Sequence, residues 1–374
     1  MFQPMLSKIL CWLRTQPIET PLLFTTLFST ALIFSVFNLT IDDTLLQGLG
    51  YYAFFGLGFL GIATFTLAIY LPVKIFFTIG QWCVAKYIDH RPVAFSPTTH
   101  VKVLYLAGVF VLFVCCIVLL LDQIYQLSPE KVSWASQLVN SFDMTVFGGY
   151  VPFSLQRIPF SELSKTIFIQ SYMLLTPILS MTFLLLLVTN VALFRKYVLA
   201  FLLTPLLSAP IWFMIPAVSP SDMYLRNVTS IEIPPAIQEA TAVVEPRVSA
   251  WLASIEEHKS QPDKGTYANT AFPSMHVAWG TVATFFCILL WRPFALLLIP
   301  WMILNIMGAV YTLQHYAIDM IAGLVIAGIA IKVVYLLLEL EKKYTQNRYD
   351  PYTALYVLQK DVCKAKQFIS DVAS

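Results

Sequence analysis

The chain has 374 residues, of which 58% are hydrophobic and only 12% are charged, and its formal net charge is +2. Soluble domains are usually about 25% charged, so this composition excludes an ordinary soluble protein and predicts an all-α integral membrane protein. A charge balance this close to neutral supplies no basic face, so we expect no nucleic-acid partner. The first apolar run follows a polar stretch without a small-residue cleavage site, so we expect no secretory signal peptide.

Apolar runs of about 20 residues can cross a bilayer as helices. The sequence contains eight such runs, although the first is short, and each predicts a transmembrane helix. They cover roughly residues 21–37, 51–72, 103–121, 168–189, 197–216, 275–291, 294–312 and 316–338.

The distribution of lysine and arginine predicts the orientation of these spans. With the N-terminus inside, the inner segments hold about twice as many basic residues as the outer ones, as the positive-inside rule requires. We therefore expect both termini to be cytoplasmic. The inner loops 190–196 and 291–293 are tight, so the spans that they join are predicted to be antiparallel neighbours.

Two outer loops, 122–167 and 217–274, are long enough to carry structure. The first contains "FDMTVFGGYVPFSLQ", whose Gly-Gly turn and aromatic residues are typical of a re-entrant or interfacial segment. The second is predicted to contain a short amphipathic helix from Val248 to His258, which would cover the outer face.

Two of the five histidines, His276 and His315, stand at the outer ends of predicted spans. Asp319 follows His315 at i+4, so their side chains share one face of a helix. Asp319 would lie about one turn inside the membrane, where an acidic residue needs a partner. A carboxylate bonded to one nitrogen of His315 makes the other nitrogen a better nucleophile or base.

The topology places His276 and His315 at the same membrane level, an arrangement that suits phosphoryl transfer. One histidine would attack phosphorus and the other would protonate the leaving oxygen. Two other readings stay open at this point. In the first, each histidine is an ordinary interfacial residue without a catalytic role. In the second, the two histidines and the aspartate are ligands of a metal ion, although no cysteine or further histidine joins them.

The stretch "FPSMHVA" and the later "HYAIDMIAG" resemble the second and third motifs of the type 2 phosphatidic acid phosphatase superfamily. "FDMTVFGG", followed by Pro152, and "IPAVSP" (residues 215–220) are similar to the inositol phosphorylceramide synthase and sphingolipid synthase branch. The resemblance covers about residues 103–338.

The resemblance implies a role for four residues. His315 corresponds to the nucleophile, Asp319 to its orienting carboxylate, and His276 to the acid that protonates the leaving group. Ser274 corresponds to a serine that contacts phosphate together with backbone amides. Helix N-termini at 275 and 315 would add favourable dipoles for an anion.

The sequence departs from the phosphatase pattern in three places. Met275 stands where a glycine is usual, and Gly308 and Ala309 replace a Ser-Arg pair. The first family motif, a lysine and an arginine followed by proline, is not matched. Arg226 is the best substitute for the missing cation, and Lys264 is a weaker one.

A site with fewer cations is better matched to a phosphodiester, with one negative charge, than to a monoester. We therefore predict a membrane lipid phosphotransferase that moves a phospho-head group from a phospholipid donor to a lipid or polyol alcohol. The alternatives are a lipid or isoprenoid phosphatase and, more remotely, a non-catalytic lipid transporter in which His315 and Asp319 relay protons. Neither metal nor another cofactor is expected, and the oligomeric state is not predicted.

The predicted domain organisation has three parts. Residues 1–100 form a two-span extension with a cytoplasmic loop, residues 101–340 form the six-span catalytic bundle, and residues 341–374 form a cytoplasmic tail. The active site is expected on the non-cytoplasmic face, which is the periplasmic side of a bacterial inner membrane or the Golgi lumen of a eukaryote.

Overall fold

The structure is a computed structural model that describes residues 17–37, 127–227 and 270–345, together with Tyr87, scattered residues between 108 and 124 and parts of 229–253. Within these ranges every regular element is a helix, which confirms the predicted all-α class. The predicted span 51–72, much of 103–121, Lys264 and residues 346–374 lie outside the described residues.

Contacts within the chain divide it into two compact units. The first comprises residues 1–118, 179–199 and 333–374, and the second comprises residues 119–178 and 200–332. All the predicted site residues belong to the second unit. The division into an extension, a bundle and a tail stays a prediction.

In the first unit, an ion cluster joins three helices at their predicted inner ends. Arg195 of α10 (Val191–Met214) donates to Glu19 of α2 (Glu19–Phe37) at 2.7 Å and to Glu341 of α15 (Ala317–Thr345) at 2.8 Å. The sequence predicted a loop at 190–196, but α10 already begins at Val191. Asn190 caps it, since its Oδ1 accepts from the amide of Leu193 at 3.0 Å. The guanidinium of Arg195 is shared between the two carboxylates.

Three described helical segments are long and apolar enough to cross a membrane, namely 191–214, 292–311 and 317–343. A fourth span is possible if the bent pair α8 (Glu162–Met173) and α9 (Leu175–Thr189) counts as one. The helices α2 and α13 (Met275–Leu290) are apolar but shorter. The described residues therefore support an integral membrane protein without confirming the count of eight spans.

The predicted span 168–189 is broken into two helices that meet at an angle of 49°. Pro177 explains the break, because it has no N–H to donate and its ring collides with the carbonyl of Met173, four residues earlier. The helix α8 ends at that residue.

The first outer loop is helical. Its helix α6 (Pro129–Phe147) begins after Ser128, whose Oγ accepts from the amide of Lys131 at 3.4 Å. It ends where Gly148 takes a left-handed conformation (φ 74°), which glycine adopts without strain. The short helix α7 (Val151–Arg157) follows. The predicted Gly-Gly turn is thus the end of a helix.

The second outer loop contains a π-helical turn η2 (Ser221–Leu225) and the short helix α11 (Pro235–Thr241). Described residues between Pro246 and Ala253 are largely helical, in agreement with the start of the predicted amphipathic helix, and the remainder of that helix lies outside the described residues. A buried cluster formed by Val139, Phe153, Val218, Met223, Tyr224, Leu313 and Tyr316 packs the outer segments onto the start of α15.

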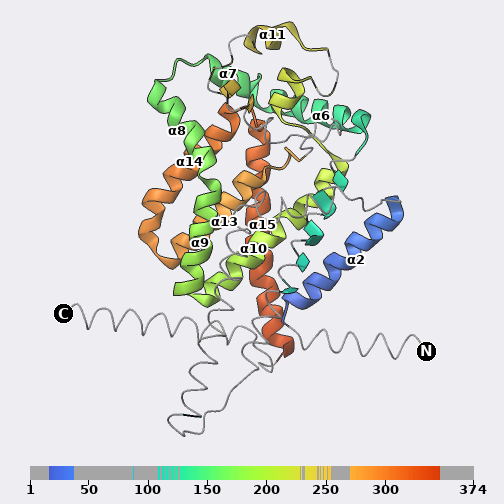
Figure 1. The fold of residues 1–374 in the computed structure, drawn as a ribbon, viewed down its shortest axis with the longest axis vertical. Coiled ribbons are helices and arrows are strands. Elements are labelled where there is room, and N and C mark those ends of the chain that lie inside the picture. The colour runs from blue at the N-terminus through green and yellow to red at the C-terminus, as the bar shows by residue number, and fades with distance from the viewer. Residues whose placement is uncertain are drawn as a thin grey trace, which may run out of the picture. The chain divides into compact units, whose positions relative to one another are not determined.

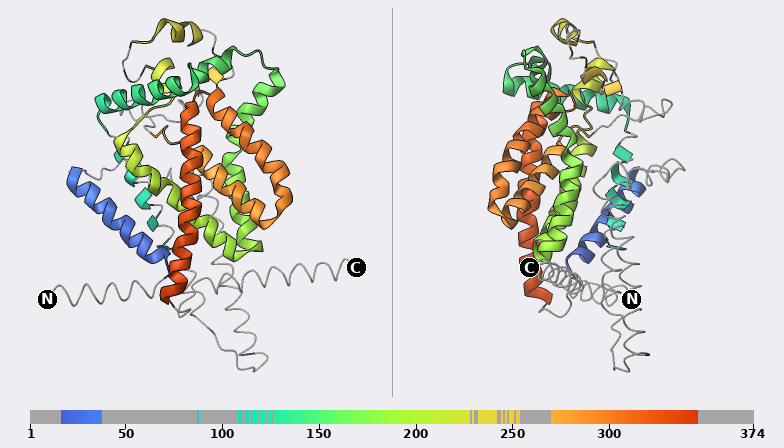
Figure 2. Two further views of the ribbon diagram at one scale, coloured as in Figure 1. Left: turned by 180° about the vertical axis from the view of Figure 1, so that it is seen from behind. Right: turned by 60° about the vertical axis from the view of Figure 1, so that its left-hand side comes forward.

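Within the second unit, α8 lies beside α14 (Ala295–Tyr311), which follows the 3-10 turn η4 (Arg292–Phe294) (Figure 1). Trp301 of α14 donates its indole N–H to the carbonyl of Ser171 at 3.1 Å. The helix α13 also packs against α14, where Gly280 faces Met302. The left view in Figure 2 shows α6 running roughly perpendicular to α15 near the end at which α15 begins.

Candidate active site

The turn before α13 presents Ser274, which is completely buried. Its Oγ accepts from the amide of Val277 at 3.4 Å, so Ser274 is the N-cap of α13. The preceding chain is held by a hydrogen bond from the amide of Ala271 to the carbonyl of Ala217 at 3.0 Å. This packing fixes Ser274 at the helix terminus, as the sequence predicted for the start near residue 275.

His315 lies in the short turn between α14 and α15. Leu313, in a left-handed conformation (φ 58°), reverses the chain, and its carbonyl accepts from the amide of Ser221 at 2.9 Å. Gln314 donates to the hydroxyl of Ser221 at 3.2 Å. The π-helical turn therefore fastens the segment that carries His315.

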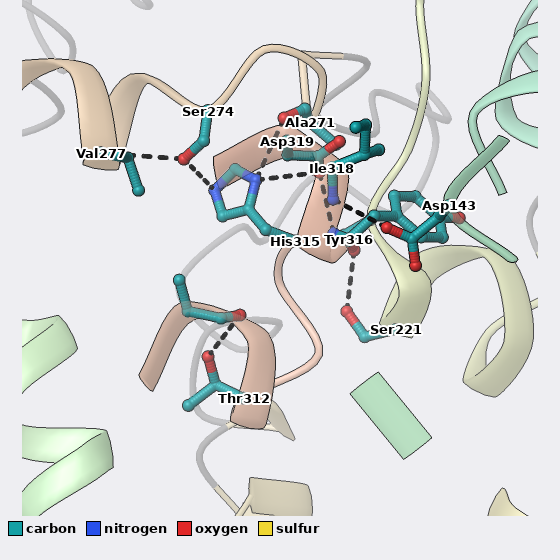
Figure 3. Close-up of polar contacts among 12 residues, drawn as sticks. Asp143, Ser221, Ala271, Ser274, Val277, Thr312, His315, Tyr316, Ile318 and Asp319 are labelled. Carbon is teal, nitrogen blue, oxygen red and sulfur yellow. Dashed lines mark hydrogen bonds and ion pairs between the residues drawn. The ribbon is translucent and has the colours of Figure 1, made fainter. Parts of the chain in front are cut away.

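The imidazole of His315 is hydrogen-bonded through both nitrogens (Figure 3). Its Nδ1 lies 3.0 Å from the carbonyl oxygen of Ala271 and 3.3 Å from Oδ2 of Asp319. Both partners accept, so the proton is on Nδ1 and the lone pair is on Nε2. The hydroxyl of Ser274 lies 3.3 Å from Nε2 and can donate to it. The geometry thus leaves Nε2 as the basic, nucleophilic nitrogen.

Asp319 is fully buried and interacts with three neighbours. Its Oδ2 faces His315 and also accepts from the amide of Tyr316 at 2.9 Å. Its carbonyl accepts from the amide of Ser274 at 3.2 Å. A Cβ on Gly323, one turn along α15, would lie 2.5 Å from the carbonyl oxygen of Ser274. Glycine is therefore needed for α15 to approach the Ser274 turn this closely.

The second histidine, His276, lies in the first turn of α13. Its ring centroid is 6.0 Å from that of His315, and the two planes are tilted by 57°. On another side it stacks on the ring of Tyr172 from α8, with centroids 4.2 Å apart and planes 10° from parallel. The structure thus brings the two predicted histidines together, and it adds an aromatic ring that the sequence did not indicate.

Asp143 was not singled out by the sequence, although it lies within the quoted "FDMTVFGG" stretch. Its side chain is 1% exposed, and Oδ1 accepts from the amide of Ile318 at 2.7 Å. Burial raises the pKa of this carboxyl, while hydrogen bonds from the amides of Ile318 and Ala317 oppose the shift. Such a contact between distant segments has no local sequence signal.

This contact changes the predicted role of the two helix N-termini. The helix α15 begins at Ala317, and Asp319 and Asp143 already occupy its first amides. The first amides of α13, on Met275 and His276, have no acceptor within the described part of the chain. Only the terminus at 275 therefore offers amides to an anion.

Arg226 lies just after the π-helical turn, and its Nη1 is 2.6 Å from Oδ1 of Asp222. Asp222 also accepts from the hydroxyl of Ser219 at 2.9 Å. The charge of Arg226 is thus paired with a carboxylate. Its predicted role toward phosphate stays a proposal.

Packing explains one of the departures from the phosphatase pattern. A Cβ placed on Gly308 would collide with the carbonyl oxygen of Phe168 and would lie 3.2 Å from Cβ of Tyr172. The backbone of α8 therefore occupies the space that the serine of the usual Ser-Arg pair would need. Ala309, at the arginine position, is fully buried.

Among the residues that the structure describes, no group of three or more His, Cys, Asp or Glu side chains is arranged to hold a metal ion. The Asp319 oxygen nearest His315 is hydrogen-bonded to Tyr316, and Nδ1 of His315 faces acceptors. The expectation of a metal-free site stays a prediction.

Comparison with family models identifies the PAP2 superfamily over residues 142–333, which contain all the residues of the site. Comparison with curated proteins and with solved structures gives no significant match. The matched region covers more than half of the chain and includes both histidines, the buried carboxylate beside His315 and the capping serine. The chain is therefore an enzyme of the PAP2 superfamily, a membrane phosphatase or phosphotransferase.

Proposed function

We propose that the protein is a lipid phosphotransferase, similar to inositol phosphorylceramide synthases, which moves a phospho-head group from a phospholipid diester to a lipid or polyol alcohol. The observation that carries this proposal is the arrangement of His315. Its Nδ1 is held by Ala271 and Asp319, its Nε2 carries the lone pair, and His276 lies 6.0 Å away between ring centroids.

In the first step, Nε2 of His315 attacks phosphorus and the bond between phosphorus and the diacylglycerol oxygen breaks. His276, in its protonated form, donates a proton to that oxygen, so diacylglycerol leaves as a neutral alcohol. The head group stays on His315 as a phosphohistidine. Asp319 and the carbonyl of Ala271 hold the Nδ1 proton and stabilise the positive charge that develops on the ring.

In the second step, the neutral His276 takes a proton from the hydroxyl of the acceptor. The acceptor oxygen attacks phosphorus, the bond to Nε2 breaks, and His315 returns to its starting form. With water as the acceptor the same cycle is a hydrolysis, so the choice between transferase and phosphatase depends on which acceptor the site binds.

The phosphate oxygens need donors that are present before the reaction. The hydroxyl of Ser274 and the free amides of Met275 and His276 are suitable, because all three lie at the positive end of α13. We propose Arg226 as the further cation. In this role Arg226 would present to the phosphate a guanidinium whose charge is already paired with the carboxylate of Asp222.

The small positive charge available at the site favours a phosphodiester substrate. The position of the family arginine is Ala309, and Arg226 is partly neutralised. A monoester carries close to two negative charges and needs more compensation than a diester with one. We further propose that the site faces the non-cytoplasmic side, either the periplasm or the Golgi lumen, that both termini are cytoplasmic, and that a bilayer supplies both lipids.

The test uses purified full-length protein in detergent, with labelled phosphatidylinositol as the diester and phosphatidic acid as the monoester. Each is assayed in metal-free buffer with and without ceramide or diacylglycerol, and His315→Ala is the control. Acceptor-dependent transfer that is lost in the variant is the expected result. Release of free phosphate from phosphatidic acid alone would show a phosphatase instead. Activity that persists in His315→Ala would refute the site.

A further inference from the structure

Asp143 stands at an unfavourable place in its own helix. It lies four residues before the last residue of α6, Phe147, so it is near the negative end of the helix dipole, which disfavours a carboxylate. It is also 1% exposed, and burial of a carboxyl group costs free energy unless hydrogen bonds compensate. Its position therefore requires a partner outside α6.

That partner is the N-terminus of α15, 175 residues further along the chain. The amide of Ile318 donates to Oδ1 at 2.7 Å, and the amide of Ala317 also donates to this carboxylate. The amide of Tyr316 donates to Asp319 at 2.9 Å. Three successive amides at the start of the helix are thus divided between two aspartates, one local and one supplied by α6. Figure 3 shows the contacts of the Tyr316 and Ile318 amides.

We propose that Asp143 is a positioning residue for the phosphotransfer reaction: it caps α15 from outside and so fixes the direction of Nε2 of His315. It does not touch the imidazole. His315 comes directly before the capped amides, and Asp319 comes directly after them, so a shift of residues 316–318 displaces both members of the pair. The proposal rests on the proposed function, in which His315 is the nucleophile.

A second consequence concerns the phosphate. An uncapped N-terminus of α15 would offer free amides and a positive dipole close to His315. Asp143 and Asp319 occupy these amides with negative charge. The amides of Met275 and His276, on the side of Ser274 and Nε2, are then the only helix-terminal donors available among the described site residues.

The test compares Asp143→Asn and Asp143→Ala with Glu130→Ala, an exposed acidic residue in the first turn of the same helix. Asparagine keeps an oxygen that can accept from Ile318, whereas alanine does not. We expect a fall in kcat of about 100-fold for the alanine variant, typical of a displaced reacting group. We expect kcat of the asparagine variant to fall by about 3-fold and KM to be unchanged in both variants. Glu130→Ala should change neither kcat nor KM.

The assay uses whichever labelled phospholipid the wild type consumes, and thermal unfolding in detergent shows that each variant is folded. A folded alanine variant with wild-type kcat would overturn the positioning role, and so would a loss confined to KM. If the alanine variant does not fold, the kcat of Asp143→Asn tests the proposal instead. A folded asparagine variant as inactive as His315→Ala would mean that the charge itself is used, against this proposal. Activity that persists in His315→Ala would instead refute the proposed function.

Discussion

The phenol ring of Tyr172 lies flat against the imidazole of His276, with ring centroids 4.2 Å apart and planes 10° from parallel. Tyr172 belongs to α8 and His276 to the first turn of α13, so the stack joins two helices at the site. A stacked ring limits the rotation of the imidazole and covers one of its faces. We infer that Tyr172 sets the direction in which His276 delivers its proton.

This relationship predicts different results for two substitutions of Tyr172. Tyr172→Phe keeps the ring, so we expect kcat within about 2-fold of the wild type, because proton transfer depends on alignment rather than on the phenol. Tyr172→Leu removes the stack, and we expect kcat to fall about 10-fold. Steady-state rates with the preferred phospholipid give both numbers. Equal rates for the leucine variant and the wild type would show that the stack has no part in catalysis.

Asp319→Asn tests how His315 is oriented. An asparagine can turn its amide N–H toward Nδ1 and favour the wrong tautomer of the imidazole. The carbonyl of Ala271, 3.0 Å from Nδ1, is a second acceptor that still holds the correct tautomer. We therefore expect kcat to fall by about 100-fold rather than to vanish.

Glu339→Gln is the matched control for Asp319→Asn, since Glu339 is exposed on the same helix. It should leave kcat unchanged. A wild-type rate for Asp319→Asn would mean that Ala271 alone orients His315.

Gly308→Ser restores the serine of the family motif, and the structure predicts that it destabilises the protein. The new Cβ would collide with the carbonyl oxygen of Phe168, and such overpacking costs about 1–3 kcal/mol. We expect a lower midpoint of thermal unfolding in detergent and no gain in hydrolysis of phosphatidic acid. Gly328→Ala is the control, because nothing lies within 4 Å of its Cβ position. An unchanged midpoint for Gly308→Ser would show that α8 and α14 are not packed this closely.

Arg226→Gln tests the proposed phosphate cation. If the guanidinium binds a phosphate oxygen equally in the ground state and the transition state, its loss raises KM by about 10-fold and leaves kcat nearly constant. Binding of a diester and of a monoester should be weakened in the same direction. An unchanged KM would show that Arg226 does not bind the phosphate and would leave it a structural role such as its ion pair with Asp222.

The sequence contained enough information to predict the part of the site formed by residues close together in the chain. The i+4 spacing of His315 and Asp319 places them together without any knowledge of the fold, and the structure brings them to 3.3 Å. The meeting of His276 with His315 also followed from a simple argument, because both residues were placed at the same end of their spans. The PAP2 superfamily match agrees with the two histidine motifs.

The non-local part could not be predicted from the sequence. Asp143, Tyr172 and the carbonyl of Ala271 reach the site through packing between segments far apart in the chain, which leaves no periodic signal. Two predicted spans, 168–189 and 197–216, differ from the helices of the structure for another reason. Hydropathy averages over a window, so it did not register the break that Pro177 introduces between α8 and α9 or the capping of α10 by Asn190.

The most direct test of the account is to trap the intermediate. Full-length protein is mixed with phosphatidylinositol labelled with ³²P in its phosphate, quenched within one turnover and digested, and the labelled peptide is identified. We predict an acid-labile, alkali-stable label on His315 that is absent in His315→Ala. The acceptor alcohol should accelerate the release of this label from the wild type. Turnover of the lipid by the wild type with no label on His315, or with a label elsewhere, would contradict the central claim.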